Sequence, residues 1–238
     1  MLAIARIPFI LATTAGLIIS LTDPNPLPPS NKERQAPQTL LAKLLSATHG
    51  MQYFQVVFPA AAAAEVAVII ADRFPSSAGA GWVLSVLSKP ETVANLHFTP
   101  FSVTGMVIII AATMLRILCY RTLKKFFTFH ISLRKDHQLI TTGPYSVVRH
   151  PSYTALIAVA FGLVGWYGAE GSWVRESGLL DTVAGKVFAS AFTVACVANT
   201  LGLVQRTVVE DKMLRNVFGK TWDEWAQRVP YRLIPGIY

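Results

Sequence analysis

Charged residues are scarce in this chain of 238 residues. They make up 14% of it, whereas hydrophobic residues make up 53%. A soluble globular domain carries about 25% charged residues. The composition therefore excludes an ordinary soluble domain and predicts an integral membrane protein.

Acidic residues are scarcer than basic ones, with 13 Asp and Glu against 21 Lys and Arg, and the formal net charge is +8. Such an excess is also typical of nucleic-acid binding. Here, however, the basic residues cluster beside apolar stretches, which suits an anionic membrane surface better. We therefore predict the lipid bilayer, and no nucleic acid, as a partner.

Only two cysteines are present, Cys119 and Cys196, and both lie inside apolar stretches. They predict buried free thiols and say nothing about the compartment. The sequence also lacks a zinc-ligand pattern and an internal repeat. We predict no metal site.

Long apolar runs, in contrast, are abundant. Crossing a bilayer takes roughly 20 mostly apolar residues, and five segments reach or approach that length: residues 2–21, 51–71, 101–120, 153–169 and 183–204. The stretch 82–88 is too short to cross and is expected at the interface. We predict an all-α integral membrane protein with about five transmembrane helices.

The first span is interpreted as retained, because no clear signal-peptidase site precedes the proline-rich stretch that follows it. Residues 22–46 are predicted to form a flexible linker. If the C-terminus is cytosolic, 15 Lys and Arg residues fall on the cytosolic side and five on the other. This split agrees with the positive-inside rule.

Three polar residues interrupt the predicted spans: Glu65, Arg116 and Asn199. Arg116 is expected near the interface with its side chain extended toward water. Glu65 is expected to face a neighbouring helix or water, and Asn199 to make a hydrogen bond between helices. None of the three is assigned to the site.

Three polar stretches share the cytosolic side: residues 130–153, 205–225 and 229–238. In the first, Gly143-Pro144 marks a turn, and Pro151 suits the first position of a helix. The free amides of that helix start attract anions, and Arg149 and His150 add donors. The stretch predicts either a pocket for a carboxylate or phosphate, or an interfacial anchor of aromatic residues and Arg.

In the second stretch, Arg206 and Glu210 are four residues apart and share one helix face. One interpretation is a surface ion pair of little energetic weight. The other has Arg206 binding a substrate carboxylate and Glu210 accepting hydrogen bonds from a ligand amine or hydroxyl.

Together, the segments "HQLITTGPYSVVRHPSY", "RTVVEDKMLRNVFG" and "VPYRLIP" resemble the isoprenylcysteine carboxyl methyltransferase family. The resemblance covers 130–238, which is expected to form the methyltransferase region with a cytosolic cofactor site. Residues 1–129 then supply N-terminal transmembrane helices. The motif containing Arg149-His150-Pro151 also occurs in phospholipid N-methyltransferases and, more distantly, in sterol reductases.

The resemblance implies S-adenosyl-L-methionine as methyl donor and the prenylated C-terminal cysteine of CaaX-processed proteins, such as small GTPases, as acceptor. It implies a multi-pass protein of the endoplasmic reticulum membrane whose active site faces the cytosol. Arg206 would be catalytic, facing the acceptor carboxylate. The cofactor site would comprise His130, His137, Gln138, Leu139, Ile140, Tyr145, His150, Pro151, Ser152, Tyr153 and Glu210. His130 stands where relatives are expected to carry glutamine, and Asp211 where they carry a second glutamate.

Such a reaction requires no general base, because the attacking carboxylate is already ionised at pH 7. The protein has to align the two reactants and replace the water around the anion. Gly162, Gly165 and Gly168 allow either tight helix packing or a gap that admits the prenyl tail. A phospholipid N-methyltransferase and a non-catalytic membrane scaffold or transporter remain the alternatives.

Overall fold

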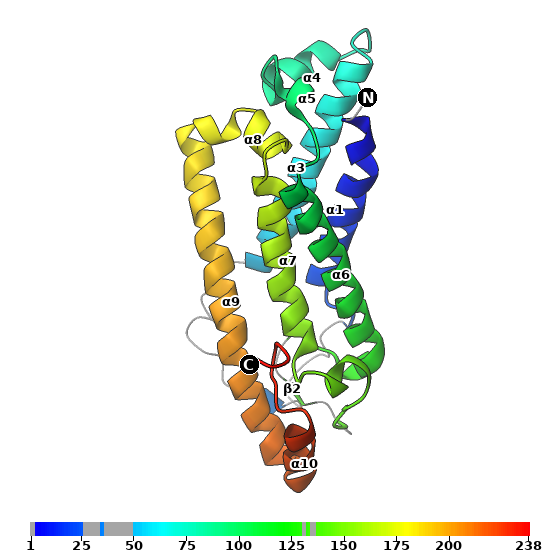
Figure 1. Cartoon of the computed structure of the whole chain (residues 1–238), viewed down its shortest axis with the longest axis vertical. Coiled ribbons are helices and arrows are strands. Elements are labelled where there is room, and N and C mark those ends of the chain that lie inside the picture. Colours follow the sequence, from blue (N-terminus) through cyan, green and yellow to red (C-terminus); the bar gives the residue numbers. More distant parts are fainter. Residues whose placement is uncertain (1–2, 26–33, 36–49, 130–131, 134–136) are drawn as a thin grey trace.

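A computed structural model describes residues 3–25, 34–35, 50–129, 132–133 and 137–238 (Figure 1). His130 and most of the predicted linker 22–46 lie outside these ranges. The helices are α1 (Ile7–Leu21), α3 (Gly50–Arg73), α4 (Ala80–Leu87), α5 (Thr92–Asn95), α6 (Pro100–Leu123), α7 (Pro151–Gly168), α8 (Trp173–Glu176), α9 (Val183–Phe218) and α10 (Lys220–Arg228). Short 3-10 turns are η1 (Ile4–Arg6), η2 (Lys124–Phe126), η3 (Gly143–Ser146) and η4 (Leu179–Asp181). Two antiparallel strands of two residues each are β1 (Arg34–Gln35) and β2 (Ser132–Leu133).

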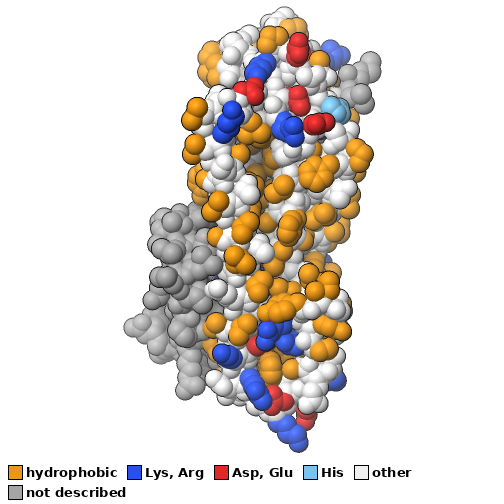
Figure 2. All heavy atoms as spheres, turned by 60° about the vertical axis from the view of Figure 1, so that its left-hand side comes forward, with side chains coloured by type: hydrophobic (Ala, Val, Ile, Leu, Met, Phe, Trp, Pro, Cys, Tyr) orange, Lys and Arg blue, Asp and Glu red, His pale blue; other side chains and the backbone are white. Residues whose placement is uncertain are grey.

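The long helices run between two ends of the molecule (Figure 1). Helices α4, α5 and α8 lie at the end that carries the N-terminus, and α10 lies at the other. Charged side chains gather at both ends of the face seen in Figure 2, and hydrophobic side chains cover the stretch between them. This distribution suits a molecule that crosses a bilayer.

In the described part of the chain, four helical segments are long and apolar enough to cross a membrane: Ile4–Leu21, Tyr53–Arg73, Pro100–Phe126 and Val183–Phe218. The predicted all-α membrane fold is thus confirmed. The fifth predicted span, α7, runs beside α6 between the same two ends but is not among the four (Figure 1). Its 18 residues begin with the polar sequence PSYT and end with WYG, so its continuously apolar part is well short of the roughly 20 residues that cross a bilayer.

Helices α6 and α7 form the closest contact of the bundle. A Cβ atom on Gly105 would come within 2.6 Å of the Trp166 nitrogen and 2.7 Å of the Gly162 oxygen, and one on Gly165 within 2.9 Å of the Gly105 Cα. Only glycine allows the two backbones to approach so closely. Of the two predicted roles, tight packing therefore holds for Gly162 and Gly165, whereas a Cβ on Gly168 would meet only Val164 of its own helix.

A buried ion pair joins the first two long segments. Arg6 Nε donates to Glu65 Oε1 at 2.8 Å, and the two side chains are 0% and 1% exposed. Arg6 also donates to the His97 carbonyl at 2.6 Å, and its guanidinium lies over the rings of Phe98 and Trp166. The partner of Glu65 is therefore a residue of the N-terminal segment, which makes that segment part of the packed fold.

The expectation for Arg116 was wrong. Its side chain is only 2% exposed, donates from Nε to the Ser20 carbonyl at 2.7 Å and contacts Ser152. Three aromatic rings lie around the guanidinium, with centres 5.0–5.5 Å from its carbon, from Tyr120, Phe127 and Phe129. Hydrogen bonds and aromatic rings inside the protein therefore replace water around the Arg116 guanidinium.

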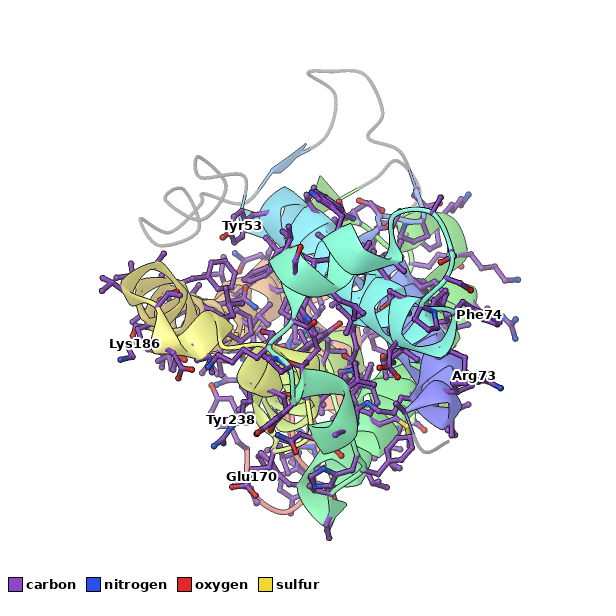
Figure 3. All side chains as sticks on the ribbon, turned by 90° about the horizontal axis from the view of Figure 1, so that it is seen from above. Tyr53, Arg73, Phe74, Glu170, Lys186 and Tyr238 are labelled. Atoms are coloured by element: carbon purple, nitrogen blue, oxygen red, sulfur yellow. The ribbon has the colours of Figure 1, made fainter. Side chains whose placement is uncertain are left out.

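Helix α9 stands apart from the other helices. Only 6% of its most apolar stretch is buried, against 33% for each of the other three candidate spans. Viewed from the N-terminal end, Lys186 near the start of α9 lies at the edge of the molecule, far from Arg73 and Phe74 (Figure 3). Most of this apolar stretch of α9 is therefore exposed on the outside of the bundle.

Candidate functional site

The three polar stretches singled out in the sequence meet at the end of the molecule opposite the N-terminus. The Arg149 amide donates to the Tyr231 carbonyl at 3.0 Å, and the His150 amide to the Arg232 carbonyl at 2.8 Å. Thr154 Oγ1 donates to the Leu233 carbonyl at 2.7 Å. The C-terminal segment thus runs along the start of α7.

Pro151 is the first residue of α7, as its sequence predicted, and His150 is the residue before the helix. The proline ring fixes a helical φ and removes an amide that would have no helical partner. His150 has an extended φ of −126°. This arrangement holds the His150 imidazole at the N-terminal end of α7.

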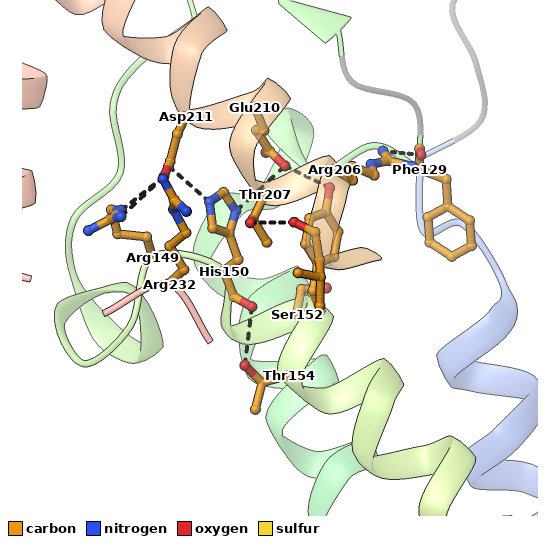
Figure 4. Close-up of polar contacts among 12 residues, drawn as sticks. Phe129, Arg149, His150, Ser152, Thr154, Arg206, Thr207, Glu210, Asp211 and Arg232 are labelled. Carbon is orange, nitrogen blue, oxygen red and sulfur yellow. Dashed lines mark hydrogen bonds and ion pairs between the residues drawn. The ribbon is translucent and has the colours of Figure 1, made fainter. Parts of the chain in front are cut away.

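Asp211 joins the three stretches through one carboxylate (Figure 4). Its Oδ2 accepts from Arg149 Nη2 at 3.1 Å and from Arg232 Nε at 2.9 Å. Its Oδ1 lies 2.9 Å from His150 Nε2. The side chain is almost fully buried, so this carboxylate exchanges water for charge-assisted hydrogen bonds.

A cavity of about 790 Å³, its open mouth included, lies beside this cluster. Its wall includes ten of the predicted site residues: His137, Gln138, Leu139, Ile140, Tyr145, His150, Ser152, Tyr153, Arg206 and Glu210. Pro151 is buried and does not line the cavity. His130 lies outside the described residues. The structure thus brings most of the predicted residues together, while their roles remain predictions.

Glu210 and Tyr153 form the polar centre of the cavity wall. The Tyr153 hydroxyl donates to Glu210 Oε2 at 2.6 Å. The Tyr153 ring stacks on the His150 imidazole, with centres 5.5 Å apart and planes inclined by 3°. His150 Nδ1 is 3.6 Å from the same Glu210 oxygen.

Arg206 does not pair with Glu210. Among the described residues, Arg206 donates from Nη2 to the Phe129 carbonyl, and its guanidinium carbon lies 5.4 Å from the centre of the Tyr153 ring. Its Nε is buried and has no partner in the described part of the chain. This geometry contradicts the surface ion pair, because both side chains are directed to the cavity instead.

Tyr145 closes the base of the cavity. Its side chain is 7% exposed, and burial raises the pKa of its phenol well above the usual value near 10. Trp225 of α10 donates from Nε1 to the Tyr145 carbonyl at 3.2 Å and is itself buried. α10 therefore fixes the position of this tyrosine.

Comparison with known proteins gives a consistent result. The model of the isoprenylcysteine carboxyl methyltransferase (ICMT) family matches residues 104–165. Protein-S-isoprenylcysteine O-methyltransferase B of Arabidopsis thaliana is 29% identical over 154 residues, which are 61% of this chain and 68% of that protein. A probable protein-S-isoprenylcysteine O-methyltransferase of Oryza sativa subsp. indica is 31% identical over 130 residues, 54% of this chain and 58% of that protein.

The predicted resemblance to the isoprenylcysteine carboxyl methyltransferase family is confirmed. A mouse Delta(14)-sterol reductase also matches, with 28% identity over 101 residues, but these are only 20% of its length. This weaker similarity agrees with the motif that the methyltransferases share with sterol reductases. No solved structure matches.

The matched segment of the methyltransferase family spans most of α6, the loop to α7 and most of α7. It includes the glycine contact between the two helices and the cavity residues from His137 to Tyr153. Arg206, Glu210 and Asp211 on α9 lie beyond it. Their place in the site is therefore supported by the geometry of this chain.

The sequence assigned no role to several residues that line the cavity. They are Leu123, Phe126, Phe127, Thr128, Met213, Leu214 and Trp225. One signal was available for two of them, because Met213 and Leu214 follow Arg206 and Glu210 at helical spacing on one face of α9. The others come from separate elements, and sequence spacing does not reveal such proximity.

Proposed function

We propose that this chain transfers a methyl group from S-adenosylmethionine to the C-terminal carboxylate of a prenylated cysteine. The acceptors would be CaaX-processed proteins such as small GTPases. The active site would face the cytosol from the endoplasmic reticulum membrane. The observation that carries the proposal is one cavity with an arginine on one wall and the Tyr153–Glu210 pair beside it.

The side chains that line the cavity suit the chemistry of S-adenosylmethionine. Glu210 offers a carboxylate to amine or hydroxyl donors, whereas Leu139, Ile140 and Leu214 supply apolar surface. When bound, this cosubstrate supplies an electrophilic methyl group on a sulfonium sulfur.

The residues proposed to hold the cosubstrate are His137, Gln138, Leu139, Ile140, Tyr145, His150, Ser152, Tyr153 and Glu210. We assign Pro151 to the start of α7, where it sets the position of His150. The predicted division into residues 1–129 and 130–238 is retained as part of the proposal.

Arg206 is proposed to bind the acceptor carboxylate. Arg206 lines the cavity and forms no ion pair with a carboxylate among the described residues, so its positive charge is available to an incoming anion. The contact with the Phe129 carbonyl fixes the guanidinium, which can then orient the carboxylate and replace part of its water. Because the carboxylate is ionised at pH 7, no side chain has to remove a proton from it.

The length of α9 supports a site at the membrane boundary. At 1.5 Å per residue, its 36 residues span about 54 Å, whereas a bilayer core is about 30 Å thick. If the core begins at the start of α9, Arg206 lies about 36 Å along the helix, just beyond the hydrocarbon. A prenyl tail favours lipid by about 0.8 kcal/mol per buried CH₂. The carboxylate then reaches Arg206 while the tail remains among apolar side chains.

The test is radiolabelled methyl transfer in membranes that contain the protein. N-acetyl-farnesylcysteine and phosphatidylethanolamine are offered in parallel as acceptors. We expect label in the farnesylcysteine. Label in the phospholipid alone would identify an N-methyltransferase and refute the proposal. Undetectable binding of S-adenosylhomocysteine at millimolar concentration, with folded protein, would favour a non-catalytic scaffold or transporter.

Arg206→Ala is expected to abolish turnover and to leave the binding of S-adenosylhomocysteine largely intact. Arg215→Ala is the matched control, because Arg215 lies on the same helix, is exposed, and pairs with Asp223 at 2.8 Å outside the cavity. Glu210→Ala should instead weaken the binding of S-adenosylhomocysteine. Normal turnover in Arg206→Ala would remove Arg206 from the acceptor site.

A further inference from the structure

The residue beside Glu210, Asp211, carries the next inference. It does not line the cavity, yet it is 4% exposed and contacts three cationic or titratable side chains. We propose that Asp211 is a positioning residue that holds His150 as the tautomer with its proton on Nε2. Nδ1 of His150 then faces the cavity as a hydrogen-bond acceptor.

The first step concerns the two oxygens of Asp211. Oδ2 accepts from three guanidinium nitrogens: Arg149 Nη2 at 3.1 Å, Arg149 Nε at 3.3 Å and Arg232 Nε at 2.9 Å. Two arginines on one carboxylate keep it ionised, and an ionised carboxylate only accepts hydrogen bonds. The nitrogen 2.9 Å from Oδ1 therefore has to be the donor, which places a proton on His150 Nε2.

The second step follows from the other side of the ring. In a neutral imidazole with the proton on Nε2, Nδ1 carries a lone pair. It lies 3.6 Å from Glu210 Oε2, which is too long for a direct hydrogen bond. That oxygen already accepts from the Tyr153 hydroxyl. Two acceptors thus stand side by side on the cavity wall.

A ligand that satisfies both acceptors needs a group with at least two donor hydrogens. An ammonium group and a sugar diol each meet this requirement. On the proposed function, on which this step rests, S-adenosylmethionine offers both, an α-amino group and a ribose. The acceptor pair formed by His150 Nδ1 and Glu210 Oε2 would bind one of them.

Asp211→Asn is the decisive change, because the two oxygens of Asp211 have different partners: Oδ2 contacts guanidinium groups and Oδ1 contacts His150. The Asn carbonyl oxygen should turn toward the three guanidinium contacts, since guanidinium groups only donate. The amide NH₂ then faces His150 Nε2, which has to accept. The proton moves to Nδ1, which becomes a donor toward Glu210 and removes one acceptor from the cavity.

The first measurement is the ¹⁵N spectrum of histidine-labelled protein without ligand, with His150→Gln to assign the signal. In the wild type we expect a protonated Nε2 and an unprotonated Nδ1, and in Asp211→Asn the reverse. A wild-type ring with a proton on Nδ1, alone or on both nitrogens, would overturn the proposal. The wild-type spectrum needs neither a ligand nor a folded variant at Asp211, so it tests the tautomer even if the proposed function fails.

The second measurement is calorimetric binding of S-adenosylhomocysteine. Loss of one acceptor should weaken binding about ten- to a hundredfold in Asp211→Asn. Asp211→Glu, which keeps the charge, should restore most of the affinity. Asp223→Asn on α10 is the matched control and should bind as the wild type does. Equal affinity in Asp211→Asn and wild type would refute the positioning role and leave the Asp211 carboxylate with a role in stability alone.

Two analogues identify the ligand group. A deaminated S-adenosylhomocysteine lacks the ammonium, and a 2′,3′-dideoxy analogue lacks the diol. The analogue that lacks the bound group should have equal affinity for wild type and Asp211→Asn, whereas the other should retain the difference. If both retain the full difference, neither group contacts the acceptor pair and the assignment fails.

Discussion

Replacing Glu65 with leucine tests the buried ion pair at the end of the bundle opposite the cavity. Glu65 and Arg6 are fully buried, so removing one partner leaves an uncompensated charge, and such a loss typically costs about 3–5 kcal/mol. Arg6 would retain the His97 carbonyl and the faces of two aromatic rings. We therefore expect the cost for Glu65→Leu at the lower end, about 3 kcal/mol.

The matching double variant, Arg6→Met with Glu65→Leu, removes both charges and keeps apolar volume. Its free energy of unfolding should be within about 1 kcal/mol of the wild type, or higher, because no charge is left to desolvate. The assay is reversible denaturation in detergent micelles followed by tryptophan fluorescence, arranged as a double-mutant cycle. A cost below about 1 kcal/mol for Glu65→Leu, or a double variant as unstable as the sum of the singles, would refute the reasoning.

Three further predictions concern other parts of the fold. Gly165→Ala should separate α6 from α7 and lower the free energy of unfolding by about 1–3 kcal/mol, because its Cβ would meet the Gly105 backbone at 2.9 Å. Gly168→Ala, whose Cβ would only touch Val164 at 3.9 Å, is the control in the same assay. Lys89→Met should leave the thermal midpoint unchanged, since its ion pair with Asp181 is exposed; a clear drop would contradict this. Burial raises the pKa of the Tyr145 phenol. The neutral phenol therefore contributes its full stabilisation below about pH 10, and this contribution is lost as the pH rises further. Tyr145→Phe should reduce the loss of stability at alkaline pH, as measured by denaturation.

Signals confined to short stretches of sequence predicted most of the architecture. Apolar length identified the spanning helices, and Pro151 marked the start of α7, because both depend on local backbone and side-chain properties. The order of three polar stretches led to one cavity. The 18 residues of α7 show the limit of this approach, since a helix covered by a neighbour needs less apolar sequence than one surrounded by lipid.

The partners of buried charges were not predictable in this way. Glu65 and Arg6 are separated by 59 residues, and no periodicity connects them. Arg116 was expected near water because basic residues follow it, but the Ser20 carbonyl and three aromatic rings satisfy it inside the protein. Asp211 was noted only as a departure from an expected glutamate, and its contacts with three side chains arise from tertiary packing.

The 36 residues of α9 form one continuous helix that joins the far end of the molecule to Arg206 and Glu210. Because a helix keeps a fixed rise, the depth of these two residues is set by where α9 is anchored at its other end. Hydrophobic mismatch would then affect the site. A bilayer several ångströms thicker would draw the Arg206 guanidinium into hydrocarbon or force α9 to tilt. The composition of the surrounding membrane, through its thickness alone, would thus tune how readily the guanidinium meets the acceptor carboxylate.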